Sequence, residues 1–215
     1  MTSQLLSAAM LAFLTACGPM NSGGLGSQAA ARLGAFTGLQ PTAPPAPPAL
    51  PTQALAAGPG NVLMVTLLSR NAVAAMTRIS TNNGTLTWRT DKGVTLSFRD
   101  DILVASRGLG DDLMGADIPG VRDAIVHGSG TAKRTHTYLN SEDTIQTRDL
   151  ACTYMTQAPE TITIASGAFE ATKVEEVCES SSLRFTNSYW LDGNTIVQST
   201  QAVALGSGYI RVNTL

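Results

Sequence analysis

The stretch from Thr85 to Ser106, TLTWRTDKGVTLSFRDDILVAS, decides the fold class of this 215-residue chain. Within it Val94, Leu96 and Phe98 alternate with polar residues, and this period of two is typical of a half-buried β-strand. The turn-forming sequences Asp-Lys-Gly and Asp-Asp separate three such runs. The stretch therefore predicts three antiparallel strands in a meander.

The same pattern extends outward in both directions. An Asn83-Gly84 pair between two β-prone segments is a strong hairpin signal, and two short helices are expected at Asp111–Met114 and Pro119–Ile125. Further β-prone runs occupy residues 62–68, 131–139, 144–156, 160–164, 169–178, 183–191, 195–203 and 208–212. Residues 61–215 are therefore predicted to form an all-β domain, an antiparallel β-sandwich or open barrel with one or two short helices.

The first 16 residues are predicted to be a signal peptide. Residues 5–16 form an apolar run, LLSAAMLAFLTA, that is too short to span a bilayer as a helix. It leads into Leu14-Thr15-Ala16-Cys17, which resembles the bacterial lipobox, so Cys17 is expected to carry acyl chains that hold the protein at a membrane. The alternative is a general secretory signal with an incidental cysteine, and residues 1–4 lack the usual positive charge.

Residues 17–60 are predicted to be a lipid-anchored, flexible tether rich in Gly, Ala and Pro. Six of the ten prolines lie between Pro41 and Pro51, in PTAPPAPPALP, a composition that favours extended chain over a packed core. Gly18 follows Cys17, whereas Asp at this position favours the inner membrane in similar lipoproteins. We therefore expect an outer-membrane location with the domain in the periplasm.

Two cysteines remain once Cys17 is assigned to the lipid. In an oxidising compartment Cys152 and Cys178 are expected to form a disulfide. The alternatives are two free buried thiols or half of a metal site, but His127 and His136 show no ligand spacing to them. No metal, cofactor or catalytic residue is expected. The net charge of −2 argues against nucleic acid as a partner.

The candidate interaction site is the turn RGLGDDLM at residues 107–114. Arg107, Asp111 and Asp112 offer directional hydrogen bonds to a glycan or a partner protein. The simplest alternative is a turn and helix cap formed by the aspartates. Glycoside hydrolysis is a third reading, but adjacent carboxylates do not naturally flank one scissile bond.

Three strings together resemble one family: LTAC at residues 14–17, TWRTDKGVTLSFRDDILVASRGLGDDLMGAD at 87–117, and FTNSYWLDGNTIVQSTQAVALGSGYIRVNTL at 185–215. They are similar to the YjbF family, also called GfcB or group 4 capsule lipoproteins. The resemblance implies an outer-membrane lipoprotein with an antiparallel β fold and a role in making or exporting extracellular polysaccharide. It supplies no catalytic motif.

The sequence thus favours an accessory factor for exopolysaccharide or capsule production that acts by binding or scaffolding and is not an enzyme. Expected partners are the membrane, through Cys17, and polysaccharide export proteins or the glycan itself. One alternative is a periplasmic carrier of lipid or another hydrophobic ligand, recognised by a large apolar pocket in an open β-barrel. A second is a polysaccharide-modifying enzyme, recognised by converging carboxylates or a histidine beside a nucleophile.

Overall fold

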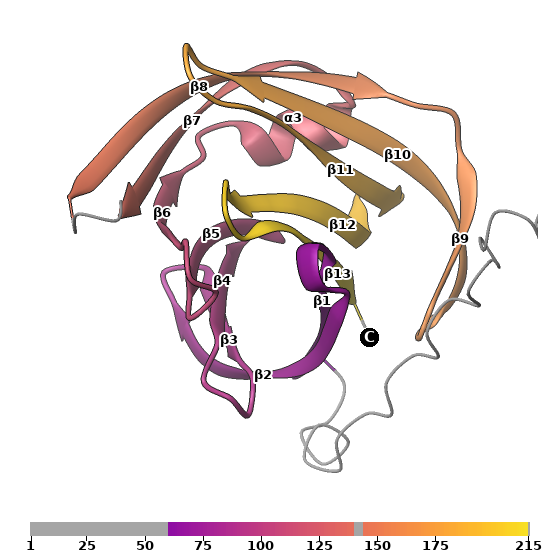
Figure 1. The fold of residues 1–215 in the computed structure, drawn as a ribbon. Coiled ribbons are helices and arrows are strands. Elements are labelled where there is room, and N and C mark those ends of the chain that lie inside the picture. The colour runs from indigo at the N-terminus through magenta and orange to yellow at the C-terminus, as the bar shows by residue number, and fades with distance from the viewer. Residues whose placement is uncertain (1–59, 140–143, 215) are drawn as a thin grey trace, which may run out of the picture. The chain divides into compact units, whose positions relative to one another are not determined.

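The computed structural model describes residues 60–139 and 144–214. The predicted signal peptide, the Cys17 anchor and nearly all of the proposed tether lie outside these residues. The described part is built almost entirely of strands, with one α-helix and one short 3₁₀ helix (Figure 1).

Thirteen strands form one antiparallel sheet in this part of the chain. The strands are β1 (Val62–Leu67), β2 (Ala72–Asn82), β3 (Thr85–Arg89), β4 (Thr95–Arg99), β5 (Ile102–Arg107), β6 (Leu113–Asp117), β7 (Ser129–Leu139), β8 (Ile145–Thr156), β9 (Glu160–Ile164), β10 (Gly167–Glu179), β11 (Arg184–Asp192), β12 (Thr195–Ala204) and β13 (Gly208–Thr214). The 3₁₀ helix η1 covers Leu68–Arg70, and the α-helix α3 covers Val121–His127.

The sheet curls into a barrel that is nearly closed. This is the open-barrel architecture, one of the two that the sequence predicts. Its order is β5-β4-β3-β2-β1-β13-β12-β11-β10-β8-β7-β6, with β9 paired to β10. The chain passes directly from one end strand, β5, to the other, β6, so the two ends of the sheet meet at the turn that joins them. We call this line of contact the seam.

The meander around residues 85–106 is confirmed as β3, β4 and β5. β3 and β4 pair in continuous antiparallel register, with Trp88 opposite Leu96, whereas the β4–β5 register shifts between Ser97 and Phe98. The preceding Asn-Gly pair forms the predicted tight hairpin between β2 and β3, and both residues have positive φ, 46° and 74°. Such turns match the right-handed twist of the strands that they join.

One expected helix is present and the other is absent. The Pro119–Ile125 prediction corresponds to α3, which is followed by the C-cap residue Gly128 with φ 65°. A Cβ at Gly128 would lie 1.9 Å from the Thr156 hydroxyl oxygen, so a larger residue here would displace Thr156 and strain a backbone that has positive φ. The helix expected at Asp111–Met114 is wrong: these residues form a turn and the first residues of β6, which pairs with β7.

The buried side chains form two main clusters. In one cluster, α3 packs against the inner face of β7, β8, β10 and β11, and Figure 1 shows the helix under these strands. The other cluster lies where β1 to β5 and β13 curl around a common interior. No helix among the described residues has the length and apolar character needed to cross a membrane.

Candidate functional site

The turn between β5 and β6 is held by the Asp112 carboxylate. The Ser106 hydroxyl donates to one of its oxygens at 2.6 Å, and the backbone N–H groups of Gly108 and Leu109 donate at 2.8 and 3.3 Å. Three donors on one half-buried carboxylate are typical of a turn-stabilising aspartate. One of the two predicted acids therefore has a clear structural role.

Arg107 connects the two end strands of the sheet. Its guanidinium group donates to the carbonyl oxygens of Leu113 and Met114, both at 3.1 Å. The Ser106 hydroxyl also accepts from the Leu113 N–H at 3.0 Å. Side chains of β5 thus bind the backbone of β6, and these contacts draw the two ends of the sheet together at the seam.

Asp111 is placed differently from its neighbour. Its backbone carbonyl accepts a hydrogen bond from the Ser207 hydroxyl at 2.5 Å, which ties the turn to the connection between β12 and β13. Its carboxylate lies directly over Gly206, where a Cβ would be 2.0 Å from the Oδ2 atom. The side chain is exposed, and no described residue forms a hydrogen bond or ion pair with its carboxylate.

Both aspartates line a pocket of about 280 Å³ at the seam. We call it the seam pocket. Its walls come from the turn after β5, the facing ends of β7 and β8, the residue before β11, and the end of β12 with the residue that follows it. The lining residues are Asp111, Asp112, Tyr138, Leu139, Gln146, Arg148, Leu183, Ala204 and Leu205.

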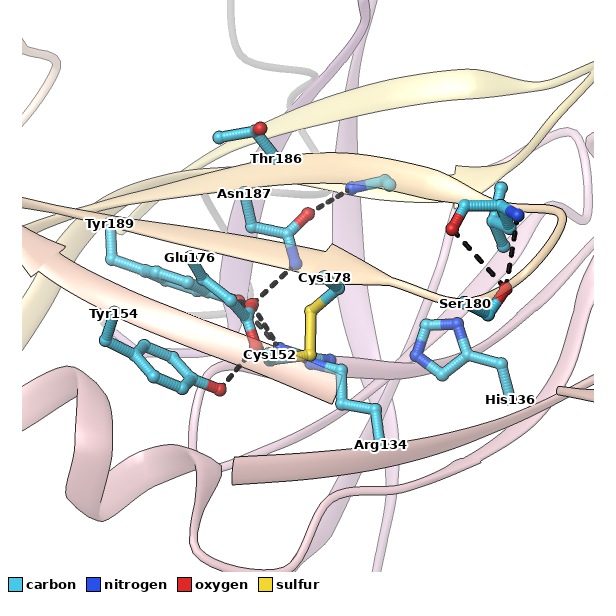
Figure 2. The surroundings of a disulfide bond; sticks show 12 residues. Arg134, His136, Cys152, Tyr154, Glu176, Cys178, Ser180, Thr186, Asn187 and Tyr189 are labelled. Atoms are coloured by element: carbon cyan, nitrogen blue, oxygen red, sulfur yellow. Dashed lines mark hydrogen bonds and ion pairs between the residues drawn. A yellow bond between two sulfur atoms is a disulfide. The ribbon is translucent and has the colours of Figure 1, made fainter. Parts of the chain in front are cut away.

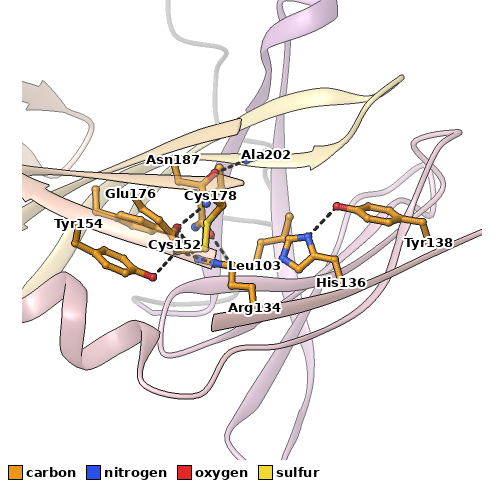
Figure 3. A network of polar contacts seen from close by, with 12 residues as sticks. Leu103, Arg134, His136, Tyr138, Cys152, Tyr154, Glu176, Cys178, Asn187 and Ala202 are labelled. Atoms are coloured by element: carbon orange, nitrogen blue, oxygen red, sulfur yellow. Dashed lines mark hydrogen bonds and ion pairs between the residues drawn. A yellow bond between two sulfur atoms is a disulfide. The ribbon is translucent and has the colours of Figure 1, made fainter. Parts of the chain in front are cut away.

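The polar side chains across this pocket are partly ordered by one another. Arg148 donates to the Gln146 side-chain oxygen at 3.0 Å and also bonds the Ser182 hydroxyl. Tyr138 and the ring of His136 share a hydrogen bond of 2.8 Å (Figure 3). Burial raises the pKa of Tyr138 to about 12, so its phenol stays protonated at neutral pH.

The seam pocket combines acceptors, donors and apolar surface in a small volume. The Asp111 carboxylate can accept hydrogen bonds and Arg148 can donate them, while Leu183 and the 80% exposed Leu205 supply apolar faces. Binding sites for small polar ligands have this composition, a few placed polar groups among apolar walls. Asp112 is already engaged by three donors, so the pair does not form two free carboxylates on opposite sides of a bond.

A buried network of charged groups lies on the strands beside the pocket (Figures 2 and 3). Arg134 on β7 and Glu176 on β10 form a two-pronged ion pair with both N–O distances at 2.7 Å. The Glu176 carboxylate also accepts from the Tyr154 and Tyr189 hydroxyls at 2.5 and 3.0 Å and from the Asn187 amide at 2.7 Å.

These contacts keep Glu176 ionised although it is fully buried. Burial alone would raise the pKa of its carboxyl, but the Arg134 charge and the hydrogen bonds from Arg134, Tyr154 and Asn187 lower that pKa overall. The network spans β7, β8, β10 and β11. Sequence reasoning missed it, since both charged residues are normally expected at the surface.

The expected disulfide is present beside this network. Cys152 and Cys178 are directly opposed across β8 and β10, with an S–S distance of 2.01 Å and Cα atoms 4.0 Å apart (Figure 2). That spacing is slightly shorter than the usual range of about 4.4–6.8 Å. Both sulfur atoms lie within 4.8 Å of a Glu176 oxygen, but bonded sulfurs lack the thiolate that binds metal.

The two histidines occupy different environments. His127 is exposed at the end of α3, and its Nδ1 atom lies 2.7 Å from the Asp123 carbonyl oxygen. His136 is buried and stacks on Phe185 with ring centroids 5.6 Å apart. Burial and then the Arg134 charge lower the pKa of His136 to about 3. In the described residues neither ring is hydrogen-bonded to a serine or cysteine.

A solved structure of another protein has a similar fold. The crystal structure of the hypothetical lipoprotein YmcC from Escherichia coli K12 superposes with a TM-score of 0.61 at 14% sequence identity, covering 71% of this chain and 84% of YmcC. The two proteins therefore share a fold. A search of curated proteins finds no match.

The match to a protein family covers more of the chain than the structural superposition does. Residues 34–215 match the family described as group 4 capsule polysaccharide lipoprotein gfcB, YjbF. Because the match covers most of the chain, this protein belongs to the YjbF family, as the sequence motifs predict. The family is one of lipoproteins related to capsule polysaccharide.

Proposed function

We propose that this protein is an outer-membrane lipoprotein that assists the production or export of an exopolysaccharide or capsule. Acyl chains on Cys17 would anchor it, with the β domain in the periplasm. Family membership supports the link to capsule polysaccharide, and the lipobox-like motif at residues 14–17 supports the anchor. The protein acts by binding or scaffolding, without a cofactor or a catalytic step.

The seam pocket is where we place this binding. The observation that carries the proposal is the exposed Asp111 carboxylate, which faces the pocket without a hydrogen-bond partner among the described side chains while Asp112 holds the turn. Asp111 would accept hydrogen bonds from sugar hydroxyls, and Arg148 would donate to them. Leu205 would contact the apolar face of a sugar ring or the surface of an export protein.

The test compares a variant of Asp111, the proposed binding residue, with a variant of Asp112, the residue that holds the turn. In cells that express the full chain at normal level, Asp111→Asn should reduce extracellular polysaccharide while leaving the melting temperature of the purified protein within about 2 °C, since the exposed carboxylate supports no described contact. Asp112→Ala should instead destabilise the protein by about 1–3 kcal/mol, because three donors lose their acceptor.

Asp192→Asn serves as the matched control, since it changes an exposed acid at the end of β11 that does not line the pocket. Purified full-length protein is then titrated with oligosaccharides cut from the polysaccharide of the same cells. Binding that Asp111→Asn weakens assigns the glycan as the ligand. Normal polysaccharide output from Asp111→Asn cells would remove the pocket from the proposal.

A further inference from the structure

A second and larger hollow opens inside the curl of β1 to β5 and β13. Its volume is about 1170 Å³, above the range of about 300–1,000 Å³ that is usual for ligand pockets. We call it the curl hollow. Apolar side chains of β1, β2, β4 and β13 line it, among them Val65, Leu67, Met76, Leu96 and Ile210.

Small residues on β2 explain why this interior is not filled. In the β1–β2 register Val65 lies opposite Ala74, and Leu67 lies opposite Ala72. Residues directly opposite in an antiparallel pair point to the same face, so both alanines face the interior with the larger side chains of β1. Their methyl groups leave space that a Leu or Phe would occupy.

Positively charged residues surround one end of the hollow. Arg70 follows β1, Arg89 ends β3, and Lys92 lies in the turn before β4, and all three are exposed. Asp91 is the one acid in the lining. Within the described residues, none of the three cations takes part in an ion pair. The end of the hollow therefore carries an excess of positive charge with no acidic partner in place.

We propose that the curl hollow binds a phosphate-bearing lipid, with its hydrocarbon chain in the apolar interior and its phosphate at Arg70, Arg89 and Lys92. An alkyl chain gains by leaving water for an apolar cavity. A phosphate accepts charge-assisted hydrogen bonds from guanidinium and ammonium groups. Neither a free phosphate nor an uncharged alkyl chain would use both parts of the site.

This inference is independent of the proposed function, because it rests on a different cavity and on different residues from the seam pocket. Loss of glycan binding at Asp111 would leave it intact. The purified full chain with Cys17→Ser is the protein for the test, so that no acyl group of its own competes for the hollow.

The experiment compares two probes with the same alkyl chain, dodecyl phosphate and dodecyl maltoside, below their micellar concentrations. Calorimetry and native mass spectrometry should show one dodecyl phosphate per chain, bound about tenfold more tightly than the maltoside and more weakly at high salt. Inorganic phosphate alone should not bind in the same range. Equal affinity for the two alkyl probes, or equal affinity for inorganic phosphate, would overturn the proposal.

Two sets of variants locate the site. Arg89→Gln with Lys92→Gln should weaken dodecyl phosphate binding about five- to tenfold and leave dodecyl maltoside binding unchanged. Arg99→Gln with Arg211→Gln is the control, because it removes two exposed cations outside the hollow. An equal loss in both double variants would mean that only net charge matters and would refute the site.

Ala74→Phe should abolish binding of both alkyl probes by filling the interior, with the melting curve reporting that the chain is folded. Unchanged binding by a folded Ala74→Phe protein would also refute the site. If that variant does not fold, the comparison of the two charge variants decides the question.

Discussion

The buried ion pair gives the sharpest test of what stabilises the domain. Arg134 is 2% exposed and Glu176 is fully buried, and five hydrogen bonds converge on the Glu176 carboxylate. The change that we consider is Arg134→Met, which keeps a long unbranched side chain but removes the charge. It leaves a carboxylate buried beside the disulfide without its counter-charge.

The expected cost follows from this arrangement. Removing one partner of a buried ion pair costs about 3–5 kcal/mol, because the remaining charge is still desolvated. For a domain of this size 1 kcal/mol corresponds to about 2–4 °C, so the melting temperature should fall by about 6–20 °C. Glu176→Gln should cost a similar amount, since it leaves the guanidinium group buried and unpaired.

The double variant isolates the interaction between the two charges. With both substitutions no uncompensated charge remains, so the loss of stability should be smaller than the sum of the single losses by at least about 1.5 kcal/mol. Thermal and urea unfolding, followed by circular dichroism, measure all four proteins. Additive losses, or single losses below about 1 kcal/mol, would refute the role given to the pair.

The same strand provides a matched control. Lys173 and Glu175 on β10 form an ion pair at 2.6 Å, but their side chains are 25% and 32% exposed. Partly exposed pairs contribute about 0–1 kcal/mol. Glu175→Gln should therefore change stability by less than about 1 kcal/mol, although it removes the same kind of charge from the same strand.

Three other predictions concern single sites. The pKa of His136 is lowered to about 3 from an unfolded value of about 6.5, so stability should be lost as pH falls from 6.5 toward 3, by about 2 kcal/mol at pH 5. Urea unfolding measured across this pH range should show a smaller loss of stability for His136→Phe than for the wild type. An equal loss in the two proteins would contradict this reasoning. Replacing Cys152 and Cys178 together by alanine should lower stability by about 3.5 kcal/mol, because the bond closes a 26-residue separation, and a melting temperature equal to that of the wild type would show that the bond contributes nothing. Cys17→Ser should abolish fatty-acid labelling and membrane fractionation, whereas an unmodified cysteine in the mass spectrum of the mature wild-type N-terminus would exclude the anchor.

The strands were predictable wherever local pattern and tertiary position agree. In β3 and β4 polar and apolar residues alternate because one face is buried, and the Asn-Gly turn fixes the hairpin before them. β2 was harder to recognise because its first residues, Ala-Val-Ala-Ala-Met, have low β propensity. They form a strand because β1 pairs with them, while β3 pairs with β2 only from Thr77 onward.

The error at Asp111–Met114 has a similar cause. Two aspartates before Leu-Met look like a helix start, but Asp112 turns its carboxylate back onto the N–H groups of Gly108 and Leu109. That closes a tight turn, after which Leu113 begins an end strand of the sheet. The local sequence is compatible with either outcome, and pairing with β7 decides it.

The candidate site could be predicted only in part. Arg107, Asp111 and Asp112 were found because they lie close together in the sequence, but the other polar walls of the seam pocket, Gln146 and Arg148, come from β8 and follow no local motif. The buried Glu176 did leave a signal. It alternates with Val174 and Cys178 on the inward face of one strand, and an acid in that position requires a buried partner.

The turn between β5 and β6 lies between the two proposed binding sites, and this position predicts how its variants will behave. Gly108 and Leu109 line the curl hollow, whereas Asp111 and Asp112 line the seam pocket. The Asp112 carboxylate accepts hydrogen bonds from the N–H groups of Gly108 and Leu109 beside the curl hollow, and it also lines the seam pocket. Asp112→Ala should therefore weaken the binding of dodecyl phosphate and of oligosaccharide together. Asp111→Asn should affect the oligosaccharide alone. Titration of each protein with both probes measures this, and an Asp112→Ala protein that loses one activity while fully retaining the other would show that the turn does not couple the two sites.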